Sequence, residues 1–105
     1  MQPPQPRLSV REFYVKLFKA LADSTRLQML ELIAGAEEYA CTTLETELPI
    51  SKSTISYHVK ILREAGLISV RREGKWFFYK ANRDVLDYYL PGLLTRLEES
   101  APPQD

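Results

Sequence analysis

The sequence has few of the residues from which disulfides, metal sites and membrane spans are built. Its 105 residues include one cysteine, Cys41, and one histidine, His58. A single thiol excludes a disulfide within the chain and any site made of two thiolates of that chain. A single imidazole limits histidine-based metal sites in the same way. No apolar run reaches the roughly 20 residues that span a bilayer. We therefore expect no metal site, no cofactor and no membrane contact.

Sequence signatures of catalysis are missing as well. The chain has no glycine-rich phosphate loop, no cysteine and histidine at a catalytic spacing, and no cluster of acids on one helix face. These absences indicate that the protein is not an enzyme. The first residues also lack the charged and then apolar segments of a secretory signal, so we expect a cytoplasmic protein.

The charge is balanced in number but not in position. Fourteen basic residues offset fourteen acidic ones over the whole chain. Residues 51–83 hold eight basic and two acidic residues, and eight minus two leaves +6 for that third of the chain. Such a concentration of positive charge is typical of a phosphate-binding surface. Charge alone indicates equally well a basic surface that is exposed only to solvent.

Apolar spacing and capping residues predict one domain over residues 9–99, with tails at 1–8 and 100–105. A helix begins at Ser9, where Ser9 and Glu12 form a capping box. A second helix is capped by Asp23 or Ser24 and stopped by Gly35 in the left-handed conformation. A third, brief helix follows a capping box of Thr42 and Glu45.

The next segments predict a helix-turn-helix followed by a hairpin. Ser51 caps a fourth helix that ends before Gly66, close behind the third helix. Branched and aromatic residues at 67–72 and 75–81 then predict two strands, joined by a turn that needs a positive φ at Gly74. Asn82 caps a last helix, which Pro91 kinks or restarts as its first residue. The expected fold is α+β and mostly helical, in the order H-H-H-H-E-E-H.

The fourth helix carries polar and basic side chains on the face opposite its apolar residues. Lysines can neutralise phosphates, and hydroxyls near the start of a helix can bond to base edges or phosphates. The hairpin tip adds a second cluster of cations on a protruding ribbon. We expect four aromatic residues of the second strand, 76–79, to alternate between faces, so that two of them pack on the domain. The candidate DNA-binding residues are Lys52, Ser53, Thr54, Ser56, Tyr57, Lys60, Arg71, Arg72 and Lys75.

Two blocks of the sequence, LFKALADSTRLQMLELI and LPISKSTISYHVKILREAGLISVRREGKWFFYKAN, strongly resemble the ArsR/SmtB-type winged-helix repressors of bacteria. The resemblance runs from about residue 10 to residue 89. It implies a homodimer, held by its first and last helices, that represses transcription on double-stranded operator DNA until an effector releases it. It also implies base-reading roles for Ser53, Thr54, Ser56 and Tyr57, and places Arg71, Arg72 and Lys75 on the wing.

The effector is where the sequence departs from better-known members of that family. Metal sensors that resemble it carry a Cys-x-Cys pair where this chain has Ala40, Cys41 and Thr42. Another metal site of the family uses acidic and histidine ligands on the last helix, and that helix has no histidine here. We therefore expect no metal site and leave the effector unidentified. We interpret Cys41 as a small buried side chain, with a reactive single thiol as the alternative, and His58 as a structural hydrogen-bond partner.

The first and last helices carry more apolar surface than a domain of this size readily buries against itself. We therefore expect a homodimer whose interface includes Phe13, Leu17, Leu21, Leu86, Tyr89, Leu93 and Leu97. The leading functional hypothesis is a dimeric repressor that binds an inverted-repeat operator. The alternative is a winged-helix module that binds another protein and not DNA, against which the basic, hydroxyl-rich fourth helix argues.

Overall fold

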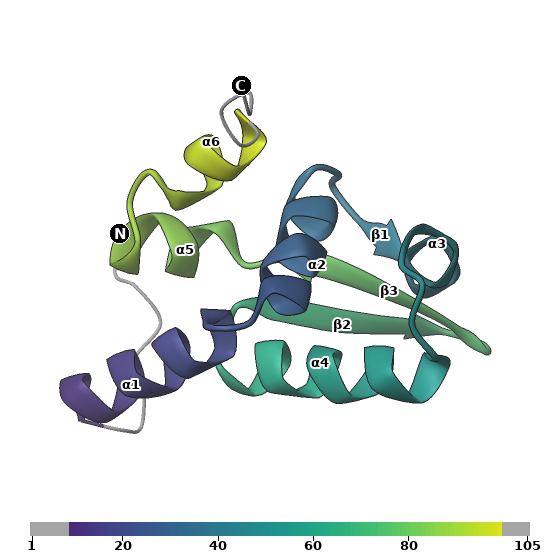
Figure 1. Cartoon of the computed structure of the whole chain (residues 1–105), viewed down its shortest axis with the longest axis horizontal. Helices are drawn as coiled ribbons and strands as arrows, with labels where there is room; N and C mark the ends of the chain where they lie inside the picture. The colour runs from purple at the N-terminus through teal and green to yellow at the C-terminus, as the bar shows by residue number, and fades with distance from the viewer. Residues whose placement is uncertain (1–8, 100–105) are drawn as a thin grey trace.

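Helices make up most of the chain in the computed structural model, which describes residues 9–99 (Figure 1). The expected tails, 1–8 and 100–105, lie outside the described residues. The expected order is confirmed, with a short additional strand before the third helix and a last helix in two pieces. The elements are α1 (Val10–Leu21), α2 (Ser24–Ala34), β1 (Tyr39–Ala40), α3 (Cys41–Glu47), α4 (Lys52–Glu64), β2 (Ile68–Glu73), β3 (Trp76–Ala81), α5 (Arg83–Tyr89) and α6 (Leu93–Glu98).

Three helix starts follow the capping signals in the sequence. Ser9 Oγ accepts a hydrogen bond from Glu12 N at 3.1 Å, and Ser9 N donates to Glu12 Oε1 at 3.1 Å, so the predicted capping box is confirmed. Asp23 caps α2 by accepting from Arg26 N at 3.0 Å. Ser51 caps α4 by accepting from Thr54 N at 3.2 Å. Each cap satisfies a backbone N–H that the first helical turn leaves without a partner.

Gly66 and Gly74, which the sequence places after the fourth helix and in the hairpin turn, both lie in the left-handed region. Gly66, with φ of 81°, ends α4, where Gly66 N donates to Arg63 O and Leu67 N donates to Leu62 O. This pair of bonds is a Schellman motif, which turns the chain sharply into β2. Gly74, with φ of 63°, forms the two-residue turn of the hairpin together with Lys75.

Three local expectations were wrong. Gly35 ends α2 with φ of −75°, which is right-handed, because its N–H continues the helical hydrogen bonding to Glu31 O. The predicted Thr42–Glu45 capping box does not form, because α3 already begins at Cys41 and its N-cap is Ala40. Asn82 precedes α5 without capping it, since its side-chain amide donates to Gly66 O at 2.8 Å and closes the base of the hairpin.

The last helix is interrupted and then restarts. α5 ends at Tyr89, and Gly92, with φ of 87°, lies before α6. Pro91 is therefore neither a kink within one helix nor the first residue of the second, because α6 begins at Leu93. The break lets the chain turn so that α6 packs beside α2.

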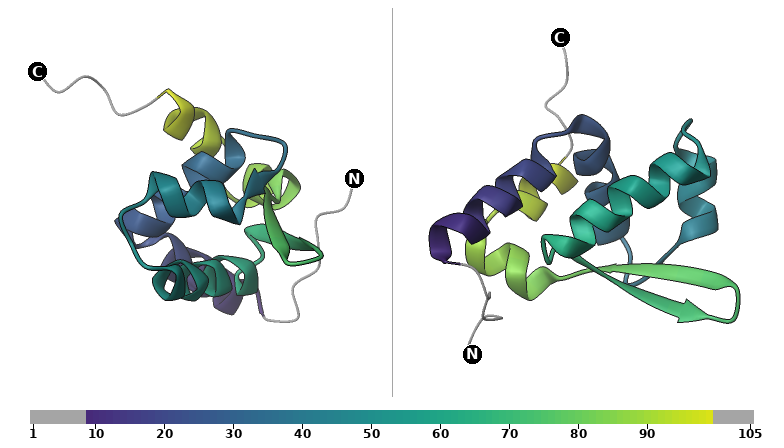
Figure 2. Two further views of the ribbon diagram at one scale, coloured as in Figure 1. Left: turned by 90° about the vertical axis from the view of Figure 1, so that its right-hand side faces the viewer. Right: turned by 90° about the horizontal axis from the view of Figure 1, so that it is seen from below.

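The sheet has the strand order β1-β3-β2 and is antiparallel throughout. The long hairpin pairs Ile68 with Ala81 at its base and Glu73 with Trp76 at its tip. β1 pairs with β3 only near the middle, through Tyr39 with Tyr79 and Ala40 with Phe78. The tip of the hairpin therefore projects beyond the rest of the domain (Figures 1 and 2).

One hydrophobic core joins the helices to the base of the hairpin. Its fully buried members include Leu17, Leu30, Leu44, Leu62 and Leu86. Two of these, Leu17 and Leu86, were expected at a dimer interface. That expectation was wrong for both, because each has no exposed surface in a single chain.

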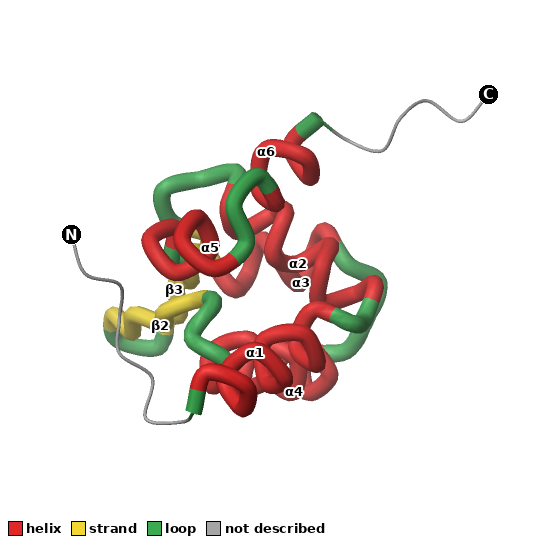
Figure 3. Tube along the Cα trace, turned by 90° about the vertical axis from the view of Figure 1, so that its left-hand side faces the viewer, coloured by secondary structure: helices red, strands yellow, loops and turns green. Residues whose placement is uncertain are grey.

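The elements that begin and end the described chain gather at one end of the molecule. α1, α5 and α6 lie at the end opposite the hairpin tip (Figure 1), and in the view from that end α1 lies in front of α4 (Figure 3). Among residues 9–99, no helix has both the length and the apolar character that crossing a membrane requires.

Candidate nucleic-acid interface

α4 presents two chemically different faces. Ile55, His58, Val59 and Leu62 are buried against the core. The opposite face exposes Lys52, Ser53, Ser56, Tyr57 and Lys60, all expected DNA-binding residues. Tyr57 leaves 60% of its surface exposed although it is a large aromatic side chain. The exposed face therefore offers two cations, two hydroxyls and a phenol, the groups that contact phosphates and base edges in a groove.

Thr54 lies differently from the other expected base-reading residues. Its side chain is half-buried, and its Oγ1 lies 2.9 Å from the Oγ of Ser51. Ser51 Oγ also lies 3.1 Å from Ser53 Oγ. The three hydroxyls form a small network around the start of α4, so Thr54 supports the helix cap.

The buried side of α4 is fixed by a hydrogen bond from α2. Arg26 Nη1 lies 3.0 Å from His58 Nδ1. An arginine side chain only donates, so Nδ1 accepts and the ring proton sits on Nε2. The prediction that His58 is a structural hydrogen-bond partner is thus confirmed, and this bond orients α4 against α2.

The hairpin tip carries two cations that no ion pair within residues 9–99 engages. Arg72 Nε donates to Gly74 O at 2.8 Å, and its guanidinium lies 5.6 Å from the centroid of the Phe77 ring. Lys75 Nζ lies 5.1 Å from the centroid of the Trp76 ring. Both charges remain available to an anionic partner, and the aromatic rings hold the two side chains at the tip.

Four aromatic residues of β3 follow a gradient of burial and do not alternate as expected. Trp76 and Phe77 are 50% and 41% exposed, Phe78 is half-buried, and Tyr79 is buried. Two of the four pack, as expected, but they are neighbours in sequence. Within residues 9–99, β1 pairs with β3 at Phe78 and Tyr79 and not at Trp76 or Phe77, so the two residues nearest the tip lack this neighbouring strand.

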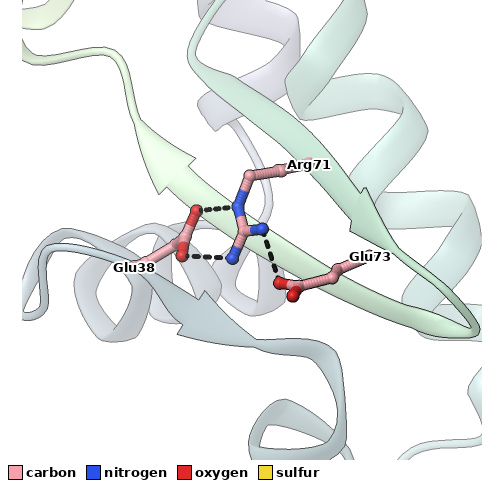
Figure 4. A network of polar contacts seen from close by, with 3 residues as sticks. All are labelled: Glu38, Arg71 and Glu73. Atoms are coloured by element: carbon pink, nitrogen blue, oxygen red, sulfur yellow. Dashed lines mark hydrogen bonds and ion pairs between the residues drawn. The ribbon is translucent and has the colours of Figure 1, made fainter.

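Arg71, the third expected wing cation, is held by carboxylates. Its Nε and Nη2 donate to the two oxygens of Glu38 at 2.7 and 2.8 Å, and its Nη1 donates to Glu73 Oε1 at 2.8 Å (Figure 4). Hydrogen bonds from Arg71 lower the pKa of Glu38, and both carboxylates raise the pKa of Arg71. Its charge is thus locally neutralised, unlike those of Arg72 and Lys75.

The hairpin tip lies at the same end of the molecule as the start of α4 (Figures 1 and 2). A helix-turn-helix formed by α3 and α4, followed by such a hairpin, is the architecture of a winged helix.

Known proteins share this architecture and much of the sequence. A helix-turn-helix domain family matches residues 21–71. YceK, an uncharacterized helix-turn-helix-type transcriptional regulator of Bacillus subtilis, is 37% identical over 78% of this chain and 83% of its own length. The arsenic resistance transcriptional regulator ArsR1 of Pseudomonas putida is 38% identical over 83% of this chain and 70% of its own. The chain belongs to the ArsR family of transcriptional regulators.

A solved structure extends the similarity to nearly the whole fold. The solution structure of a homodimeric winged helix-turn-helix DNA-binding domain from Mycobacterium bovis, a possible ArsR-family regulator, superposes with a TM-score of 0.69. The two are 27% identical, and the match covers 95% of this chain and 100% of that one. The expected winged helix-turn-helix fold and the expected family are both confirmed.

Cys41 lies at the start of α3 in this ArsR-family chain and is half-buried. Its thiol donates to Glu45 Oε2 at 3.5 Å. Burial, together with the nearby Glu45 carboxylate, raises the pKa of the thiol, so it stays protonated at neutral pH. Within residues 9–99, no group of three or more His, Cys, Asp or Glu side chains is placed to hold a metal ion.

Sequence reasoning missed two residues that shape this interface. Arg26 anchors α4 through His58, and Glu38 holds Arg71. Neither lies in the basic segment 51–83. Arg26 is 32 residues from His58 in sequence, and Glu38 is 33 residues from Arg71. No local sequence pattern identifies such pairs. The one signal was the position of each residue: Arg26 lies among the apolar residues of α2, and Glu38 is an acid directly before β1.

Proposed function

We propose that this ArsR-family chain is a repressor that binds an inverted-repeat operator as a homodimer and is released from it by an effector. α4 enters the major groove, and the hairpin lies along the adjacent backbone or minor groove. The observation that carries this proposal is the exposed polar face of α4, which begins at the same end of the molecule as the hairpin tip (Figure 1). Arg72 and Lys75 at that tip take part in no ion pair within residues 9–99. It acts on DNA in the cytoplasm.

The exposed side chains divide into two roles. Lys52, Lys60, Arg72 and Lys75 contact phosphates, which gives affinity without sequence information. Ser53, Ser56 and Tyr57 reach base edges from the first half of α4. Thr54 acts with Ser51 through the helix cap, as its hydrogen bond supports.

The dimer forms at the end of the molecule that holds α1 and α5. Aromatic rings from both helices pack there, with Phe13 4.6 Å and Tyr14 5.6 Å from Tyr89 between ring centroids. Around them Val10, Phe18 and Tyr88 remain exposed. An apolar patch of this kind favours a partner surface, and the M. bovis relative is homodimeric in solution. A second copy seated there would point the two hairpins away from each other.

Selection of bound duplexes from a random DNA pool tests the proposal. We expect enrichment of an inverted repeat whose half-sites are about one helical turn, roughly 34 Å, apart. Repeating the selection with candidate metals, thiol oxidants and small molecules identifies the effector as the addition that abolishes enrichment. A pool that stays random with the pure protein in every condition would refute sequence-specific DNA binding.

A further inference from the structure

The side chain of Arg71 bridges the whole width of the sheet. Arg71 lies on β2 opposite Phe78 of β3, and Phe78 in turn lies opposite Ala40 of β1. The Arg71 guanidinium passes over the Phe78 ring at 4.6 Å from its centroid. It also reaches both oxygens of Glu38, the residue before β1 (Figure 4). One side chain thus connects an edge strand, across the central strand, to the segment that leads into the other edge strand.

Glu38 belongs to the segment that leads into the helix-turn-helix. β1 follows it directly, and Ala40 of β1 is the N-cap residue of α3. β1 pairs with β3 and so joins the hairpin to the segment that leads into α3. This strand has only two residues. So short a strand orients a hairpin poorly, whereas a two-pronged arginine–carboxylate pair fixes both distance and plane. The Arg71–Glu38 pair therefore strengthens the connection that β1 makes.

The charge around Arg71 is unsuited to a phosphate. Glu38 and Glu73 supply two negative charges against the single positive charge of Arg71, so the cluster has a net charge of −1. A phosphate that approached Arg71 would have to displace both carboxylates or remain beside them. Arg72 and Lys75, one and four residues further along, take part in no ion pair within the described part of the chain.

We propose that Arg71 is a wing-positioning residue, which holds the hairpin against the helix-turn-helix through Glu38 and Phe78 and does not contact phosphate. The proposal deepens the DNA-binding function proposed above and depends on it for its consequence. Removing either partner lets the hairpin reorient relative to α4. DNA affinity then falls through geometry and not through lost charge.

Salt dependence of operator binding separates the two roles. Each phosphate contact contributes about one to the slope of log affinity against log salt. We expect Lys75→Ala to reduce the slope by about one. We expect Arg71→Ala to weaken binding about two- to fivefold, the range for an exposed ion pair, with the slope unchanged. A slope that falls by about one in Arg71→Ala would overturn the proposal.

Two further variants give different results for the two roles. Arg71→Lys keeps a charge that a phosphate accepts but loses the fork that Glu38 requires, so we expect it to bind as weakly as Arg71→Ala. Glu38→Ala removes a negative charge near the DNA and should strengthen binding if charge alone matters. We expect it to weaken binding instead. Wild-type affinity in Arg71→Lys, or tighter binding by Glu38→Ala, would contradict the proposal.

A measurement on the free protein keeps this test separate from the question of DNA binding. Amide hydrogen exchange should quicken about two- to fivefold in β1 and the hairpin of Arg71→Ala and Glu38→Ala, and stay at the wild-type rate in Lys75→Ala. Unchanged exchange in the first two variants would refute the positioning role, even if the protein binds its operator. Faster exchange in these two variants, in a protein that selects no DNA, would support the positioning role of Arg71 and refute the proposed DNA-binding function.

Discussion

Arg26 connects three helices through one side chain. Its Nε donates to Ala20 O at 2.7 Å and its Nη2 to Lys19 O at 3.3 Å, which satisfies two carbonyls at the end of α1. Its Nη1 reaches His58 on α4, and its backbone N–H is capped by Asp23. These bonds join the start of α2 to the end of α1 and to the buried side of α4, so Arg26 fixes how the three helices pack.

Asp23, which caps α2, makes the stability of the fold depend on pH. The hydrogen bond from Arg26 N lowers the pKa of Asp23, and the Arg26 guanidinium adds to the effect. A carboxylate whose pKa is lower in the folded state stabilises fully above its unfolded pKa of about 3.9 and loses that contribution as the pH falls through the folded value. We expect Asp23→Ala to lower the free energy of unfolding by about 1 kcal/mol at pH 7. The difference from wild type should shrink below about pH 4, as urea denaturation at each pH will measure.

Asp23→Asn separates the cap from the charge. Asparagine caps helices about as well as aspartate, so this variant should keep most of the stability at pH 7 and lose the acid dependence. Asp87→Asn, which removes an exposed carboxylate on α5, serves as the control for the loss of one negative charge. An Asp23→Ala variant whose deficit persists undiminished at pH 2 would contradict the assignment.

At the scale of the elements, the glycines that end α2 and α4 differ in conformation. Gly66 has φ of 81° and turns α4 into the hairpin, whereas Gly35 ends α2 in right-handed geometry. A non-glycine residue in the left-handed region is unfavourable by about 1–2 kcal/mol. In right-handed geometry alanine is favoured over glycine, because it restricts the unfolded chain. The same substitution should therefore have opposite effects at the two positions.

We expect Gly66→Ala to lower the free energy of unfolding by about 1–2 kcal/mol and Gly35→Ala to raise it by up to about 1 kcal/mol. A Cβ on Gly35 would lie 3.4 Å from Glu31 O, an ordinary contact, and a Cβ on Gly66 would meet nothing within 4 Å. Backbone conformation alone therefore decides both signs. Urea denaturation followed by circular dichroism measures the two changes, and equal signs would refute this explanation.

How much the sequence predicts also depends on how local each signal is. Helix starts at Ser9, Asp23 and Ser51 were predicted because the capping partner lies three residues away. The exposed polar face of α4 follows from periodicity within one helix. The start of α3 was missed because β1, which ends one residue before it, forms only by pairing with a distant strand. The Arg71–Glu38 pair and the burial gradient along β3 likewise depend on which segments meet in the folded chain.

At the scale of the whole molecule, the fold separates two surfaces. The start of α4 and the hairpin tip lie at one end, and α1 and α5, whose aromatic rings pack together, lie at the other (Figure 1). Of the expected interface residues, Phe13, Leu21, Tyr89, Leu93 and Leu97 are partly buried against the core, so they reach a partner only through part of their surface. Three further apolar side chains at this end, those of Val10, Phe18 and Tyr88, are more exposed, at 69%, 54% and 60%.

Two tyrosines of equal exposure allow the two surfaces to be tested against each other. Tyr88 on α5 and Tyr57 on α4 are each 60% exposed, so glutamate at either position should leave the core intact. A charge placed within an apolar interface opposes association, and central aromatic residues contribute about 2 kcal/mol or more. We expect Tyr88→Glu to raise the dimer dissociation constant more than tenfold in sedimentation equilibrium. Tyr57→Glu should remain dimeric and lose operator affinity instead.

Binding of the inverted repeat by Tyr88→Glu should fall to that of a single half-site, because only the dimer places two copies of α4 one helical turn apart. A Tyr88→Glu protein that remains a tight dimer would move the interface away from α1 and α5.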